Sequence, residues 1–190
     1  MKTPLLLAAA LLFGGALASC TKENLDPDGL VPTTQEGKGT GDFLLNGVAF
    51  GPRPSAGCQA CAPVNAYWGR SAHGHNDDVQ LSFYRYDNPN KDQSFTLFLS
   101  DVLRPGTFIL DAAVSPYVAP GGLGQFGMYK LRIIPNHLPY LTGPQAQGQV
   151  IVTRFDTTAH IISGTFEAKL REYQGTDSIS ITKGRFDLKF

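Results

Sequence analysis

Apolar and polar residues alternate with a period of two through most of the chain beyond residue 42. Successive side chains of a β-strand point to opposite faces, so this pattern is typical of strands with one buried face and one face in water. Strands are expected at residues 42–50, 79–84, 94–99, 106–110, 125–134, 149–155, 162–170, 179–181 and 186–190. No stretch beyond the N-terminal segment shows a 3.6-residue period with helix caps. The pattern predicts an all-β fold, either an antiparallel β-sandwich or a flattened barrel.

The first expected strand pair surrounds the dipeptide Asn46-Gly47. Asn-Gly between two apolar runs favours a tight hairpin, because a type I′ turn needs positive φ at both central residues. Such a turn pairs Leu45 with Val48 and places both on one apolar face with Phe43 and Phe50. Further along, Gly184 interrupts the last apolar run and indicates a β-bulge or bend.

Three longer segments lack the alternation. They are residues 51–74, 111–124 and 135–147, and the last two are rich in proline and glycine. Irregular segments of this length in a compact domain are often binding loops, so these are the first surfaces to consider for a ligand.

The N-terminus has the features of an export signal: Lys2 is its only charge, and an unbroken apolar run covers residues 5–13. That run is too short to cross a bilayer. The sequence Leu17-Ala18-Ser19-Cys20 follows, and it resembles the bacterial lipobox. The resemblance implies diacylglyceryl transfer to the Cys20 thiol and cleavage before Cys20. An ordinary secretory signal, which would leave Cys20 as a free thiol, is the alternative.

These features divide the chain into a signal peptide at 1–19, a lipid-anchored flexible tether at 20–41 and a β-sandwich domain at 42–190. Thr21 stands where aspartate would favour retention in the inner membrane, so the sorting rule of Gram-negative bacteria implies the outer membrane. The following Lys22, Glu23, Asp26 and Asp28 are similar to the acidic signals of Bacteroidota surface lipoproteins. We therefore expect the domain to face the cell surface rather than the periplasm.

The last third carries short motifs with a recurring glycine. They are Gly148-Gln149-Val150, Ile162-Ser163-Gly164-Thr165-Phe166 and Ile181-Thr182-Lys183-Gly184-Arg185-Phe186. With the early Asn-Gly hairpin they resemble a group of uncharacterised Bacteroidota lipoproteins over roughly half of the chain. The resemblance implies a class and a location, and no activity.

The net charge of the chain limits the classes of molecule that we expect it to bind. Lys plus Arg and Asp plus Glu both number 16, so the net charge is zero. A nucleic-acid-binding protein needs a basic surface that displaces counterions from phosphates, so this class is not expected.

Cys58 and Cys61 are the two cysteines left once Cys20 is assigned to lipid. In an oxidising compartment an even pair favours a disulfide. A thioredoxin-like redox role is the weaker alternative, because Pro63 follows the pair and no βαβ pattern surrounds it.

A run of possible metal ligands follows, His73-Gly74-His75-Asn76-Asp77-Asp78. It is similar to the metal motif of metallo-β-lactamases but has Asp78 where that motif has histidine. With Cys58 and Cys61 the two histidines could in principle bind zinc, but only Gly74 separates them, whereas a zinc finger has three to five residues between its histidines. A polar turn is the favoured interpretation, and no metal or cofactor is expected. A metal-assisted hydrolase that uses His73, His75 and Asp77 remains the alternative function.

Several aromatic residues lie outside the clear core positions. Tyrosine and tryptophan rings offer flat surfaces that suit sugar rings or protein hot spots. The candidate ligand-binding residues are Tyr67, Trp68, Tyr84 and Tyr86, and Tyr117 and Tyr140 are further exposed candidates. The sequence thus favours a non-enzymatic binding or accessory module, held on a membrane through Cys20, with a glycan or protein ligand.

Overall fold

We analysed a computed structural model, which describes residues 25–58, 61–69, 77–86, 92–117, 124–132 and 138–190. These residues form eleven strands and no helix. The strands are β1 (Thr40–Leu45), β2 (Val48–Ala49), β3 (Val64–Gly69), β4 (Asp78–Arg85), β5 (Asp92–Leu99), β6 (Gly106–Leu110), β7 (Phe126–Arg132), β8 (Tyr140–Leu141), β9 (Gly148–Asp156), β10 (Ile161–Glu172) and β11 (Ser178–Lys189).

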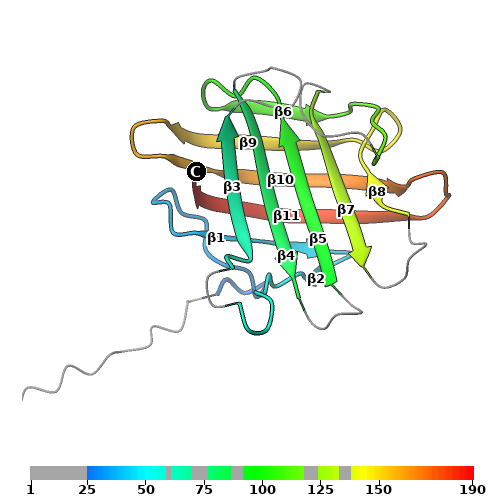
Figure 1. The fold of residues 1–190 in the computed structure, drawn as a ribbon, viewed down its shortest axis with the longest axis horizontal. Coiled ribbons are helices and arrows are strands. Elements are labelled where there is room, and N and C mark those ends of the chain that lie inside the picture. Colours follow the sequence, from blue (N-terminus) through cyan, green and yellow to red (C-terminus); the bar gives the residue numbers. More distant parts are fainter. Residues whose placement is uncertain (1–24, 59–60, 70–76, 87–91, 118–123, 133–137) are drawn as a thin grey trace, which may run out of the picture.

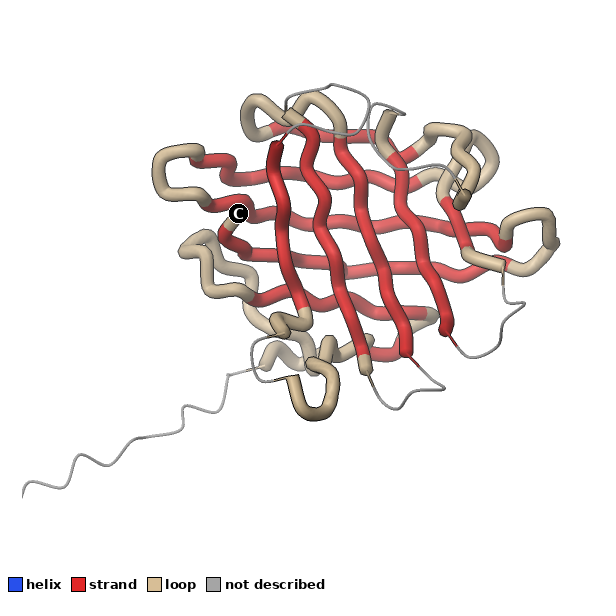
Figure 2. The backbone as a smooth tube through the Cα atoms, viewed as in Figure 1, coloured by secondary structure: helices blue, strands red, loops and turns tan. Residues whose placement is uncertain are grey.

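The strands belong to a single antiparallel sheet that is strongly curled into a half-barrel (Figure 1). One layer has the order β2-β1-β11-β10-β9-β6, and the other has the order β7-β5-β4-β3. The two-residue strand β8 joins them, since it pairs with β10 on one side and with β7 on the other. The strands of one layer run across those of the other (Figure 2). The all-β antiparallel prediction is confirmed.

The main core lies between the two layers and is rich in phenylalanine. Phe43 is fully buried at its centre. Its ring stacks on Phe50 at a centroid distance of 4.4 Å and meets the edges of Phe83, Phe95 and Phe166 at 5.3–5.8 Å. The inward positions expected from the alternation are buried as predicted, for example Val79, Leu81, Leu97, Ile162 and Leu170.

The Asn46-Gly47 hairpin is confirmed in its turn and register. Asn46 and Gly47 both have positive φ, at 49° and 82°, and Leu45 pairs with Val48. The expected apolar face is only partly correct, because the turn end of the hairpin projects beyond the core and leaves Val48 69% exposed.

The bulge expected near Gly184 is confirmed by register shifts between β11 and both of its neighbours. The residue with positive φ is Lys183, at 53°. Gly184 is required for a different reason: a Cβ atom there would lie 2.4 Å from the Phe166 ring.

Two strands lie in segments where none was expected. Strand β3 lies within residues 51–74, and β8 lies within residues 135–147. The alternation in β3 is weak in the sequence because its inward side chains are Val64, the small Ala66 and the amphipathic Trp68.

Residues 25–39, which we call the strap, lie against the outer face of β11 and β10, although the sequence analysis placed them in the flexible tether. Leu30 is fully buried, and the backbone N–H of Gly39 donates to the Asp187 carbonyl at 2.9 Å. The domain boundary expected at residue 42 is therefore too late.

Asp187 on β11 holds the strap by hydrogen bonds, and we call this contact the Asp187 clamp. The buried carboxylate of Asp187 accepts hydrogen bonds from the backbone N–H groups of Glu36, Gly37 and Lys38 at 2.7–3.2 Å and from the hydroxyls of Thr34 and Ser163. Burial alone would raise the pKa of Asp187, but these hydrogen bonds outweigh it and lower the pKa to about 2. The carboxylate is thus ionised and fully satisfied.

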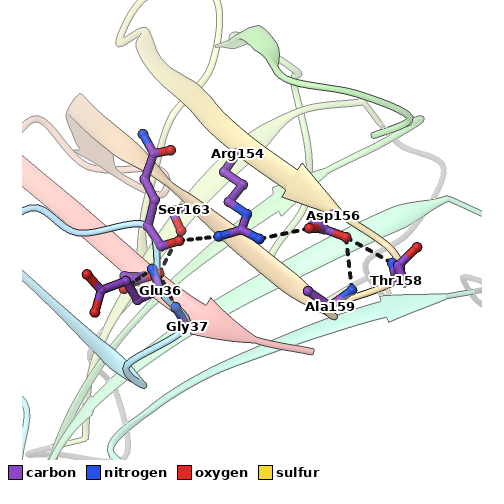
Figure 3. A network of polar contacts seen from close by, with 9 residues as sticks. Glu36, Gly37, Arg154, Asp156, Thr158, Ala159 and Ser163 are labelled. Carbon is purple, nitrogen blue, oxygen red and sulfur yellow. Dashed lines mark hydrogen bonds and ion pairs between the residues drawn. The ribbon is translucent and has the colours of Figure 1, made fainter.

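A second contact extends this network to β9. The Arg154 guanidinium donates to the Gln35 carbonyl of the strap and to Asp156 at 2.8 Å. Asp156 in turn accepts from the backbone N–H groups of Thr158 and Ala159, which belong to the β9–β10 turn (Figure 3). The strap is therefore joined to three consecutive strands of the layer.

Candidate functional site

A groove of about 670 Å³ opens at the corner where β8 joins the two layers. Its volume lies within the range of small-molecule sites. Two of the irregular segments named in the sequence analysis meet there. Residues 113–114 belong to the segment 111–124, and residues 142–146 belong to the segment 135–147. The end of β10 and the turn after it complete the wall. We call it the corner groove, and it is lined by Ala113, Val114, Leu141, Thr142, Gly143, Pro144, Gln145, Ala146, Arg171, Glu172, Tyr173, Gln174 and Gly175.

Planar polar side chains lie along one side of the corner groove. Arg171 Nε donates to the Gly175 carbonyl at 3.1 Å, and its Nη1 donates to Gln145 Oε1 at 3.1 Å. These bonds join the β10–β11 turn to the loop after β8. Glu172 and Gln174 also line the groove, so the groove offers both donors and acceptors.

Tyr173 is the aromatic residue in the lining of the groove, and Tyr117 lies next to it. The Tyr173 ring packs on a second apolar cluster formed by Phe98, Phe126 and Leu141. Tyr117, which is 74% exposed, meets the Tyr173 ring edge-on at 5.9 Å. The segment that carries Tyr117 covers the outer face of β5 and β7, which explains why Phe98 is buried although the alternation points it outward.

Tyr140 is held in a fixed hydrogen bond nearby. Its hydroxyl donates to Asp177 Oδ2 at 2.7 Å. This bond is the main reason that the pKa of Tyr140 is raised to about 12 and that the pKa of Asp177 is lowered. Tyr140 therefore stays protonated at neutral pH and fastens β8 to the β10–β11 turn beside the groove.

The four aromatic residues predicted as a ligand site are not brought together. Tyr67 is exposed on the outer face of β3, whereas the neighbouring Trp68 points inward and packs against Phe155 and Phe190 at 5.8 and 5.5 Å. Tyr67 pairs with Gln80 on β4, and Tyr84 is four residues further along that strand, or roughly 13 Å away.

Tyr84 and Tyr86 form a separate pair. Their rings stack at 5.8 Å with an interplanar angle of 12°. The predicted residues thus divide into an exposed Tyr67, a stacked tyrosine pair and a Trp68 that belongs to the core.

The other candidate chemistry is partly within the described residues. The sulfur atoms of Cys58 and Cys61 lie at disulfide distance, with their Cα atoms 5.4 Å apart. His73 and His75 lie outside the described residues. The Asp77 carbonyl accepts a hydrogen bond from the Val102 N–H at 2.8 Å. Within the described part of the chain, no group of three or more histidine, cysteine, aspartate or glutamate side chains is placed to hold a metal ion.

The loops of the corner groove could be recognised in the sequence, whereas its polar side chains could not. Loop length and proline content marked the two loops. Arg171 and Glu172 end an ordinary alternating strand and Tyr173 begins the turn after it, and only the curl of the sheet at β8 brings these residues beside those loops.

No family model, curated protein or solved structure matches the chain. Among the described residues, no helix is long and apolar enough to span a membrane.

Proposed function

We propose that this protein is a lipid-anchored module of the cell envelope that binds a glycan in the corner groove without catalysing a reaction. The observation that carries the proposal is the groove itself, where the two proline-rich loops meet the end of β10 and the turn after it, so that Tyr173 and planar polar side chains line one opening beside Tyr117. We place the module on the outer membrane, facing the cell surface, on the basis of Thr21 and the acidic residues after it.

The anchor rests on Leu17-Ala18-Ser19-Cys20 after a short apolar run. Two or three acyl chains give stable membrane attachment, because each buried methylene contributes about 0.8 kcal/mol. An exported location also agrees with Cys58 and Cys61, which we propose form a disulfide, since disulfides persist outside the cytoplasm.

Cys20→Ser is expected to abolish incorporation of labelled fatty acid and to move the protein from the detergent phase to the aqueous phase in phase partitioning. The lost acyl chains are the reason. Cys61→Ser is the matched control, which should remain in the detergent phase. Unchanged fatty-acid labelling of the Cys20→Ser variant would disprove the anchor.

A glycan suits the groove for two reasons. The apolar C–H face of a sugar ring packs on an aromatic ring such as Tyr173 or Tyr117. The hydroxyls around that ring are satisfied by groups that both donate and accept, as Arg171, Glu172 and Gln145 do. No catalytic pair is needed for such binding.

Tyr173→Ala is expected to weaken binding of the glycans that the parent protein retains on an array by roughly 10-fold or more, because a stacking surface is lost. Tyr67→Ala removes an exposed tyrosine far from the groove and should leave binding unchanged. Loss of binding in Tyr67→Ala with unchanged binding in Tyr173→Ala would place the glycan site on the outer face of β3. Absence of any glycan binding by the parent protein would refute the glycan proposal.

A further inference from the structure

The strap limits how far the domain can move from a lipid at Cys20. Leu25 is five residues after Cys20, and five residues span at most about 18 Å whatever their conformation. A folded chain of about 165 residues has a radius of gyration of roughly 15 Å. The connection is therefore shorter than the domain is wide, and the domain cannot present every face to the membrane equally.

The start of the strap is fixed on the sheet. The Arg185 guanidinium on β11 pairs with the Asp26 carboxylate, and its Nη1 donates to the Val31 carbonyl at 3.0 Å. Lys183 Nζ pairs with Asp28 at 2.9 Å. With Leu30 buried between these contacts and the Asp187 clamp, the point where the chain reaches the domain has a defined position.

That position is nearer to the β2 edge of its layer than to the β6 edge, because β11 is two strands from β2 and three strands from β6. Strand β11 neighbours β1, and β1 neighbours β2, where this edge of the layer ends. Strands are about 4.8 Å apart, so β2 is roughly 10 Å from β11. Figure 1 shows the start of the strap on this side of the molecule, below β1. The opposite edge of the same layer is β6, about 24 Å from β2 at the same spacing.

We propose that the β2 edge of the domain faces the bilayer and that lipid headgroups are the partner of this edge. The inference rests on the proposed anchor at Cys20. The short connection and the fixed start of the strap place this edge nearest the membrane. Two apolar side chains on this side are largely exposed, Val48 at 69% and Leu25 at 54%, and both suit the boundary between headgroups and acyl chains.

The test compares two labelled positions on opposite edges of one layer. Val48→Cys lies on the β2 edge, and Ile109→Cys lies on the β6 edge, where Ile109 is 46% exposed. Each full-length lipidated variant is labelled with a donor fluorophore without reductant, so that the Cys58–Cys61 pair stays closed. It is then placed on phosphatidylethanolamine–phosphatidylglycerol vesicles that carry an acceptor on their headgroups. We expect energy transfer to be at least about twofold higher from position 48, because about 24 Å separates the two edges.

Inserting about 20 Gly/Ser residues after Asn24 frees the domain and is expected to equalise transfer from the two positions. Equal or reversed transfer without the insertion would overturn the orientation and leave the anchor standing. Failure of the lipid-bearing fraction to sediment with vesicles would overturn the anchor, and the orientation with it.

Discussion

Replacing Asp187 by alanine is expected to lower the free energy of unfolding by about 3–5 kcal/mol. The substitution removes the acceptor for three backbone N–H groups of the strap and for the Thr34 and Ser163 hydroxyls. Urea denaturation measures the loss, and hydrogen exchange locates it. The amides of Glu36, Gly37 and Lys38 should exchange much faster, while those of the β4–β5 pair change little.

Asp28→Ala is the matched control for Asp187→Ala. It removes another carboxylate that holds the strap, but the Asp28–Lys183 pair is largely solvated, and such pairs contribute less than about 1 kcal/mol. If Asp187→Ala were no more destabilising than Asp28→Ala, the hydrogen bonds of Asp187 to the strap would contribute nothing beyond an exposed ion pair.

The lowered pKa of Asp187 predicts how the free energy of unfolding decreases in acid. Because the pKa of Asp187 is lowered in the folded chain, from 3.8 to about 2, its contribution is complete above pH 4. It is lost as the pH falls from about 4 to 2, and the linked stability is about 2 kcal/mol. The difference in unfolding free energy between the parent and Asp187→Asn should shrink over this range. A constant difference would contradict the lowered pKa.

Phe43→Ala is expected to destabilise the protein by about 3–5 kcal/mol, the usual cost of removing a fully buried aromatic side chain. Phe43 contacts four other phenylalanines, from both layers of the half-barrel. The cavity would therefore open where the layers meet. Since natural domains are stable by about 5–15 kcal/mol, this single loss takes a large share of the total.

Two variants separate packing from other effects of this substitution. Phe43→Leu keeps most of the volume and should cost clearly less than Phe43→Ala. Tyr117→Ala removes a ring of similar size from the surface and should change stability by less than about 1 kcal/mol. Equal losses in Phe43→Ala and Tyr117→Ala would place the main core elsewhere.

Local pattern was enough to predict most of the strands. In β4 the inward positions 79, 81 and 83, and in β5 the inward positions 95, 97 and 99, all carry large apolar residues, so the alternation is plain. The longer β10 shows its pattern through Ile162, Phe166 and Leu170. The register of the hairpin at Asn46-Gly47 could be predicted because it depends only on these two residues, which both adopt positive φ. Strand β3 was missed because one inward position is Ala66, which contributes little to a hydrophobic pattern.

The strap could not be predicted, because the forces that hold it act over long sequence distances. Thr34 and Asp187 are 153 residues apart, and the strap has few apolar residues to form a pattern. Asp187 and Arg185 alternate with Phe186 and Leu188 as exposed residues would, yet they are buried under the strap. Polar residues that are buried by hydrogen bonding leave the same periodic signal as polar residues in water.

The corner groove was predictable only in part, for a related reason. Its loops are marked by proline and length, whereas the partners Gln145 and Arg171 are brought together by the short strand β8. A two-residue strand has no detectable period, so the turn of the sheet from one layer to the other leaves no trace in the sequence.

The strap also determines which strand of the domain bears a mechanical force that is applied to the N-terminal end of the chain. A force applied to the chain at Leu25 passes through the contacts of Asp26, Thr34 and the following amides into Arg185 and Asp187, and so into β11. That strand is bonded along both sides, to β1 and to β10. The pull is thus shared by two ladders of hydrogen bonds on an interior strand, and it does not peel the short edge strand β2 from β1 one bond at a time.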